Sequence, residues 1–185
     1  MKGSTSDRIA RRLQAHGRGF VFTPTDFLDL GHRASIDQTL SRLARRNRIR
    51  RLSRGIYDYP RMNPKLGALS PTSDAVAHAL ARQSHGVAQV APAQAANLLG
   101  VSKHVPAQAI YLTNGPSRKV QIGRRLIVLR HASPKTLVAA GTNAGTVVQA
   151  VRYLGKRASA DGAPFVQSLA DRLSSKDRDV LVSCP

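Results

Sequence analysis

Seven arginines lie within residues 35–59, and their number and spacing are typical of a segment that binds nucleic acid. The planar guanidinium group matches the O6 and N7 acceptors of guanine, and a glutamine amide pairs in a similar way with adenine. Side chains on the first part of the stretch are expected to reach base edges: Gln38, Thr39, Arg42 and Arg45. Side chains that flank them are expected to contact the DNA backbone or form a wing: Ser35, Arg46, Arg48, Arg50, Arg51, Arg54 and Tyr57.

Two alternatives to DNA contact stay open for these side chains. The arginines are otherwise a solvated charged face. Tyr57 and Tyr59 either meet the nucleic acid or pack against the helices, and packing is the more common role of tyrosine at the base of a wing.

A helix and a hairpin must position these groups. Ile36, Leu40 and Leu43 recur at i, i+4 and i+7, which predicts an amphipathic helix that starts at Ser35 as N-cap and fades at Asn47. A hairpin follows, with its turn at residues 53–55 and a β-bulge where the alternation of residues 49–52 breaks. Together they are typical of the recognition helix and wing of a winged helix-turn-helix.

The preceding residues supply the other elements of that fold. A first helix is expected over Ser4 to Gln14 with Ser6 as its cap, and a short extended step over residues 20–22. A compact second helix is expected from Thr23, with Pro24 at its first position, to Leu30. Residues 1–62 are therefore predicted to be a winged helix-turn-helix domain.

A proline-rich stretch without periodicity predicts a linker over residues 63–70 and a second domain over 71–185. In that domain we expect helices, strands and then helices again, so the fold class is α+β with a mixed α+β C-terminal domain. The expected helices and strands are 74–83, 92–99, 109–113, 119–122, 125–129, 142 or 143 to 154, 164–173 and 174–182, with turns at Asn114-Gly115 and Gly123 between the three strands.

The charge balance indicates a polyanionic partner. The chain has 29 basic and 10 acidic residues, a formal charge of +19, and every acid is aspartate. The net charge is +9 over residues 1–62 and +10 over residues 63–185. A basic ribosomal or chromatin-like protein, or an arginine-rich proteome, is the alternative explanation.

A second basic group lies on the expected strands of the later domain: Arg118, Lys119, Arg124, Arg125 and Arg130. Flanking DNA, an RNA or protein target, and a purely solubilising role all remain open for it.

Enzymatic, metal-binding and membrane functions find little support in the residues. The six histidines lack ligand spacing, the single cysteine is Cys184, and residues 141–146 lack the lysine and glycine spacing of a phosphate loop, so helix capping explains them better. No apolar run approaches the roughly 18 residues of a membrane span, and residues 1–12 lack a signal-peptide core. We therefore expect a cytoplasmic protein that is not an enzyme and has no metal or cofactor.

Three short sequences carry a family resemblance: residues 54–57 read RGIY, residues 95–100 read AANLLG, and residues 111–115 read YLTNG. In this order they resemble the AbiEi-type antitoxins of bacterial type IV toxin–antitoxin systems, in particular the group labelled DUF6088. The resemblance covers most of the chain and weakens after about residue 140. It implies a winged-domain repressor that binds inverted repeats upstream of its own operon. It also implies a C-terminal domain that neutralises a nucleotidyltransferase-like toxin without a stable complex.

The sequence therefore predicts a sequence-specific transcriptional repressor that binds double-stranded DNA at an inverted-repeat operator. The alternative is an RNA- or protein-binding adaptor that uses the basic C-terminal domain, with the winged fold as a protein-interaction module.

Overall fold

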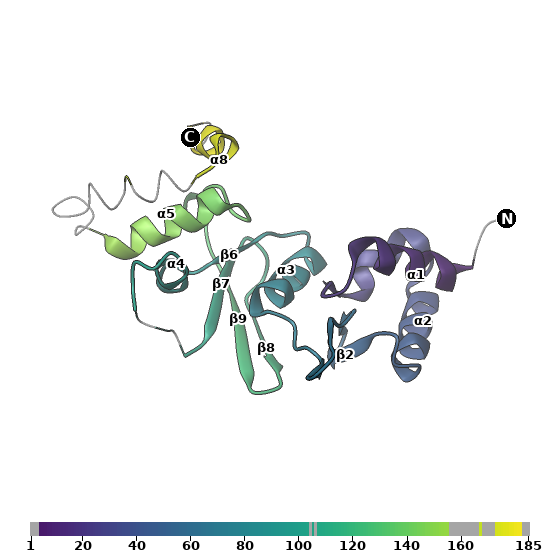
Figure 1. Ribbon diagram of the computed structural model, residues 1–185. Coiled ribbons are helices and arrows are strands. Elements are labelled where there is room, and N and C mark those ends of the chain that lie inside the picture. The colour runs from purple at the N-terminus through teal and green to yellow at the C-terminus, as the bar shows by residue number, and fades with distance from the viewer. Residues whose placement is uncertain (1–3, 104, 106, 156–166, 168–172, 183–185) are drawn as a thin grey trace. The chain divides into compact units, whose positions relative to one another are not determined.

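The chain folds into two compact units of mixed α and β structure (Figure 1). The computed structural model describes residues 4–103, 105, 107–155, 167 and 173–182. Unit 1 comprises residues 1–85 with 120–124, and unit 2 comprises residues 86–119 with 125–185. The mixture of helices and strands confirms the predicted α+β class.

Residues 5–58 of unit 1 follow the predicted order of elements, whereas the short hairpin over residues 62–68 was not predicted and the helix over 73–83 was expected in the second domain. It contains α1 (Thr5–His16), β1 (Val21–Phe22), the 3₁₀ helix η1 (Pro24–Leu30), α2 (Arg33–Arg45), β2 (Arg50–Ser53), β3 (Ile56–Asp58), β4 (Met62–Asn63), β5 (Gly67–Ala68) and α3 (Ser73–Gln83).

Two helix starts in unit 1 differ from the sequence expectations, and the second helix starts where it was predicted. The cap of α1 is Ser4 and not Ser6, because Ser4 and Asp7 form a reciprocal capping box. The second helix begins as predicted, with Thr23 and Asp26 as a capping box and Pro24 at the first position, and it is a 3₁₀ helix. The start of α2 is earlier than predicted: His32 is its N-cap, so Ser35 lies inside the first turn and caps nothing.

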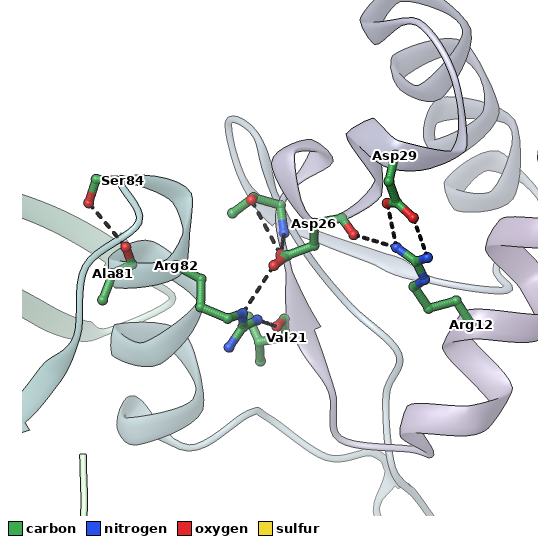
Figure 2. Close-up of polar contacts among 8 residues, drawn as sticks. Arg12, Val21, Asp26, Asp29, Ala81, Arg82 and Ser84 are labelled. Atoms are coloured by element: carbon green, nitrogen blue, oxygen red, sulfur yellow. Dashed lines mark hydrogen bonds and ion pairs between the residues drawn. The ribbon is translucent and has the colours of Figure 1, made fainter.

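The division between the units falls after His85, later than the predicted linker. Residues expected to be linker form part of the β4–β5 hairpin, and α3 packs on β1 and η1. The Arg82 guanidinium holds α3 in place: Nε lies 3.0 Å from Asp26 Oδ1, and Nη2 donates to the Val21 carbonyl at 2.8 Å (Figure 2). The prolines at residues 60–71 therefore mark a change of local structure and not the end of a unit.

A three-stranded antiparallel sheet in the order β1-β3-β2 closes unit 1. Its register pairs Val21 and Arg50 with Asp58, and it shifts between Arg51 and Ser53, which confirms the predicted bulge. Gly55 has φ 72° in the turn, a conformation that glycine adopts without strain. The returning strand β3 includes Ile56 and Tyr57 and ends at Asp58.

One hydrophobic core joins α1, η1, α2 and the sheet of unit 1. Its largest members include Phe22 and Phe27, whose rings meet edge to face at 5.3 Å. The predicted apolar stripe of α2 enters this core: Ile36 and Leu40 are fully buried and Leu43 packs at its edge. The core therefore fixes which face of α2 is turned to solvent.

Unit 2 is built on a four-stranded sheet in the order β6-β7-β9-β8, of which residues 120–122 of β8 are grouped with unit 1. Its elements are β6 (Ala88–Val90), α4 (Pro92–Leu98), β7 (Ala109–Thr113), β8 (Arg118–Ile122), β9 (Arg125–His131), the 3₁₀ helix η2 (Pro134–Thr136), α5 (Asn143–Leu154) and α8 (Ser175–Val182). Helices α4 and α5 lie side by side (Figure 1). The helix expected over 164–173 falls mostly outside the described residues.

The strand pairing in unit 2 departs from the simple succession of turns that the sequence indicates. Strand β7 pairs in parallel with β9, so Asn114-Gly115 does not close a hairpin between sheet neighbours. Asn114 Oδ1 instead accepts a hydrogen bond from the Val87 backbone at 2.9 Å. This contact ties the end of β7 to the start of β6.

Residues 141–146 serve as a helix cap in unit 2, as predicted. The Thr142 hydroxyl accepts from the Gly145 amide at 3.1 Å, and Gln89 Oε1 accepts from the Gly141 amide at 2.9 Å. A Cβ at Gly145 would lie 2.3 Å from the Ala139 carbonyl oxygen, so only glycine fits there. The glycines allow close packing and do not form a phosphate cradle.

Two bidentate arginine–aspartate pairs in unit 1 differ mainly in burial. Arg50 Nη2 lies 2.6 Å from Asp58 Oδ2, with the Asp58 side chain 1% exposed. Arg12 Nη2 lies 2.6 Å from Asp29 Oδ2, with the Asp29 side chain 60% exposed. Arg50 also donates to the carbonyls of Ala68 and Leu69 and so ties the β4–β5 segment to the sheet.

Removal of the buried carboxylate is expected to destabilise unit 1. The Asp58→Ala substitution should lower the free energy of unfolding by about 2–4 kcal/mol, because Arg50 then lacks the counter-charge of a buried pair. Asp29→Ala is the matched control, and its effect should be far smaller because solvent already screens that pair. Urea denaturation measures both changes. Equal losses in the two variants would contradict this account.

Candidate nucleic-acid interface

Many arginines of unit 1 are engaged within the fold. Figure 2 shows Arg12 donating to both carboxylate oxygens of Asp29 and Arg82 donating to Asp26. The hydrogen bonds from Arg12 lower the pKa of the Asp29 carboxyl, so the pair stays ionised and its charges offset each other. Further arginines donate to carboxylates or main-chain carbonyls: Arg8, Arg11, Arg18, Arg33, Arg50 and Arg61.

A second set of arginines makes no such contact. Their side chains are exposed and form no ion pair or hydrogen bond with any other residue that the structure describes. We call this set the free-arginine cluster: Arg42, Arg45, Arg46, Arg48, Arg51 and Arg54. Its members lie in the second half of α2, in the segment that follows this helix, and on the β2–β3 hairpin, with the engaged Arg50 between two of them.

The acids nearest in sequence to the free-arginine cluster are already paired. Residues 38–57 contain no Asp or Glu. Asp37 accepts from Arg33 Nε at 2.9 Å, and Asp58 is buried against Arg50. The cluster therefore keeps its positive charge, which is the condition for attracting phosphate groups.

Three of the four predicted base-contacting residues are exposed on α2: Gln38, Arg42 and Arg45. The prediction for Thr39 is wrong, because its side chain is only 8% exposed. Thr39 is three residues after Ile36 and therefore lies on the buried face of the helix. The i, i+3 spacing was the available signal for this placement.

The residues predicted to contact the DNA backbone or to form the wing also fall into two groups, one exposed and one engaged within the fold. Arg46, Arg48, Arg51 and Arg54 belong to the free-arginine cluster, and Ser35 is exposed within the first turn of α2.

Two of the predicted wing residues have structural roles instead. The four contacts of Arg50 to Asp58, Ala68 and Leu69 occupy its guanidinium. Tyr57 is 7% exposed and stacks on Phe22 at 6.0 Å, so the packing alternative applies. Sequence reasoning missed Asp58, although it and Arg50 flank the predicted turn as opposite charges on facing strands.

The second basic group lies at exposed positions of the β8–β9 region. Within unit 2, Arg118, Lys119 and Arg130 line one hollow of about 260 Å³, together with Gln108 and Ser117. Arg124 is grouped with unit 1 and Arg125 with unit 2. Arg118 and Arg125 already interact with other residues of the chain.

Unit 2 also has an unusual charge composition. Residues 86–155, which belong to unit 2 except for residues 120–124, contain eight Lys and Arg but no Asp or Glu. Carboxylates of this segment therefore cannot neutralise its cations, in contrast to the paired arginines of unit 1.

The described part of the chain offers neither a metal-binding cluster nor a membrane-spanning helix. It holds no group of three or more His, Cys, Asp or Glu arranged to bind a metal ion. None of its helices combines the length and the apolar character needed to cross a bilayer.

Comparison with known proteins places the chain in a family but not in a functional class. Residues 8–177 match the family described as "Family of unknown function (DUF6088)". No curated protein and no solved structure shows a significant match. Because the match covers nearly the whole chain, the protein belongs to the DUF6088 family.

Proposed function

We propose that the protein is a sequence-specific transcriptional repressor that binds double-stranded DNA through unit 1. The observation that carries this proposal is the free-arginine cluster. Six exposed guanidinium groups without partners among the described residues extend from α2 onto the adjacent hairpin, while the neighbouring acids are paired. Positive side chains that are not paired within the protein attract a polyanionic ligand such as DNA.

In this proposal unit 1 is a winged helix-turn-helix. The order α1, β1, η1, α2 and the β2–β3 hairpin supports the assignment, with α2 as recognition helix and the hairpin as wing. Gln38, Arg42 and Arg45 contact base edges, and the remaining arginines of the cluster contact phosphates. Arg50 is no longer among the contacts, because it stabilises the hairpin from within.

The resemblance to AbiEi-type antitoxins extends the proposal to a biological setting. We infer a cytoplasmic autorepressor bound as two copies to an inverted repeat upstream of its operon. Unit 2 would then neutralise a nucleotidyltransferase-like toxin without a stable complex. Co-expression with a nucleotidyltransferase from the same operon tests this part: rescue of growth supports it, and unrelieved toxicity contradicts it.

The acid-free segment of unit 2 favours a second candidate, an RNA- or protein-binding adaptor. Residues 86–155 contain eight basic residues, seven of them in unit 2, without a single carboxylate, and they provide cations independent of α2. On this reading DNA binding by unit 1 is secondary.

If α2 contacts base edges, replacing one of its exposed arginines should lower both the affinity for DNA and the sequence specificity. Arg45→Ala should weaken binding to a duplex selected from a random pool by about 1–3 kcal/mol and relax the preference at one base pair. Arg42→Ala should behave alike at a different position. Fluorescence anisotropy on selected and scrambled duplexes measures the effect, with Lys65→Ala as a one-charge control in unit 1. Equal losses on both duplexes would remove α2 from base readout.

Phosphate contact by the hairpin predicts a change in salt dependence. For Arg51→Gln/Arg54→Gln, the slope of log K against log salt concentration should become shallower by about 1.8, roughly 0.9 for each lost contact. The control Arg11→Gln/Lys65→Gln removes the same charge elsewhere in unit 1 and should leave the slope nearly unchanged. Identical slopes in the two double variants would contradict the wing assignment.

Removing two positive charges from unit 2 distinguishes the proposed repressor from the proposed adaptor. We expect Lys119→Gln/Arg130→Gln to alter binding of the selected duplex no more than the Arg11→Gln/Lys65→Gln control does. Anisotropy with the duplex and with a structured RNA makes the comparison. RNA binding that is tighter than duplex binding, and is lost in this variant, would favour the adaptor instead.

A further inference from the structure

Unit 1 contains a hollow that the proposed DNA contacts do not explain. It has a volume of about 390 Å³ and is lined by α1, the end of α2, the start of the hairpin and Tyr59. This volume lies within the range of small-molecule sites, roughly 300–1,000 Å³. The hollow is therefore large enough for a small organic ligand.

The lining separates into a buried apolar part and an exposed charged part. Leu13 and Ile49 are 4% and 3% exposed and belong to the hydrophobic core, and Leu43 packs beside them. Arg46 and Arg48 are exposed members of the free-arginine cluster. A ligand in this hollow thus meets apolar side chains and two guanidinium groups.

The charges that line the hollow favour one negative charge on the ligand. Asp7 is the only acid in the lining, against Arg46 and Arg48, which leaves a net charge of +1. The Asp7 carboxylate is already held in the capping box, where Oδ2 accepts from the Ser4 hydroxyl at 2.8 Å and the Ser4 amide at 3.1 Å. The two arginines have no such partner within the described chain and are available to an anionic group.

We propose that this hollow is a binding site for a small amphipathic monoanion, with an apolar body against Leu13, Leu43 and Ile49 and an acidic group at Arg46 and Arg48. Apolar burial and charge-assisted hydrogen bonds both contribute, so neither a neutral apolar molecule nor an inorganic anion satisfies the whole site.

Occupancy of the hollow has a consequence that rests on the proposed function. Arg46 and Arg48 are also assigned to phosphate contact, and one guanidinium cannot serve both anions fully. The ligand therefore lowers the affinity for DNA, as an inducer does for a repressor.

Two fluorescent probes that differ in one group test the site without DNA. 8-Anilinonaphthalene-1-sulfonate has an aromatic body with one sulfonate, and N-phenyl-1-naphthylamine has the same body without it. We expect saturable binding of one sulfonate probe per chain, about tenfold tighter than the neutral probe. Arg46→Gln/Arg48→Gln should abolish this preference, whereas Arg11→Gln/Lys65→Gln should keep it. Equal affinity for both probes in the wild-type protein overturns the proposal.

A substitution that fills the hollow provides the second test. Ala10 lines the hollow on α1 and is only partly buried, so Ala10→Phe occupies the space from a helix surface. Its circular dichroism and DNA affinity should match the wild type, while both probes bind at least about tenfold more weakly. Unchanged probe binding in this folded variant places the probes elsewhere and overturns the proposal.

The coupling to DNA has its own readout. Saturating sulfonate probe should raise the dissociation constant of the wild-type protein for the selected duplex, but not that of Ala10→Phe. Bound probe with unchanged DNA affinity overturns the coupling. A protein that binds the probe but no DNA in any condition contradicts the proposed function and leaves the site itself established.

Discussion

The buried ion pair between Arg50 and Asp58 is the interaction on which the arrangement of unit 1 depends. It joins directly paired residues of β2 and β3, and the same guanidinium reaches two carbonyls at the end of the β4–β5 segment. A carboxylate that is 1% exposed is tolerated only when its charge is met in this way. The pair thereby fixes the hairpin and removes the nearest downstream acid from the surface.

Four of the other five acids of unit 1 are likewise engaged, by an arginine or in a helix cap. Asp26, Asp29 and Asp37 each accept from an arginine, and Asp7 accepts at the start of α1. With 10 acids against 29 basic residues in the chain, most arginines have no carboxylate to pair with. Six of the arginines without a carboxylate partner form the free-arginine cluster, on α2, the β2–β3 hairpin and the segment between them. The same six residues support the proposed DNA contacts, and two of them line the hollow of unit 1.

Local patterns predicted the elements of residues 5–58 well, but they did not predict the β4–β5 hairpin. The stripe of Ile36, Leu40 and Leu43 specified the buried face of α2, and the broken alternation at residues 49–52 specified the bulge. Helix starts were less predictable, since several serines and threonines near each start offer comparable caps. The parallel pairing of β7 with β9 was not predictable either, because it depends on contacts between residues distant in sequence.

The sequence alone could not show which arginines are paired within the fold and which are free. In the sequence Arg50 and Arg51 are equivalent, yet one is bonded four times and the other is exposed without a partner among the described residues. The difference arises from strand alternation and the bulge, which place their side chains differently. The most direct measurement of this division is arginine modification by p-hydroxyphenylglyoxal, mapped by mass spectrometry with and without the selected duplex. We predict rapid modification of the free-arginine cluster, protection of it by DNA, and slow modification of Arg12, Arg50 and Arg82 in both conditions. Uniform modification of all arginines, or DNA protection that spares the cluster, would contradict the account.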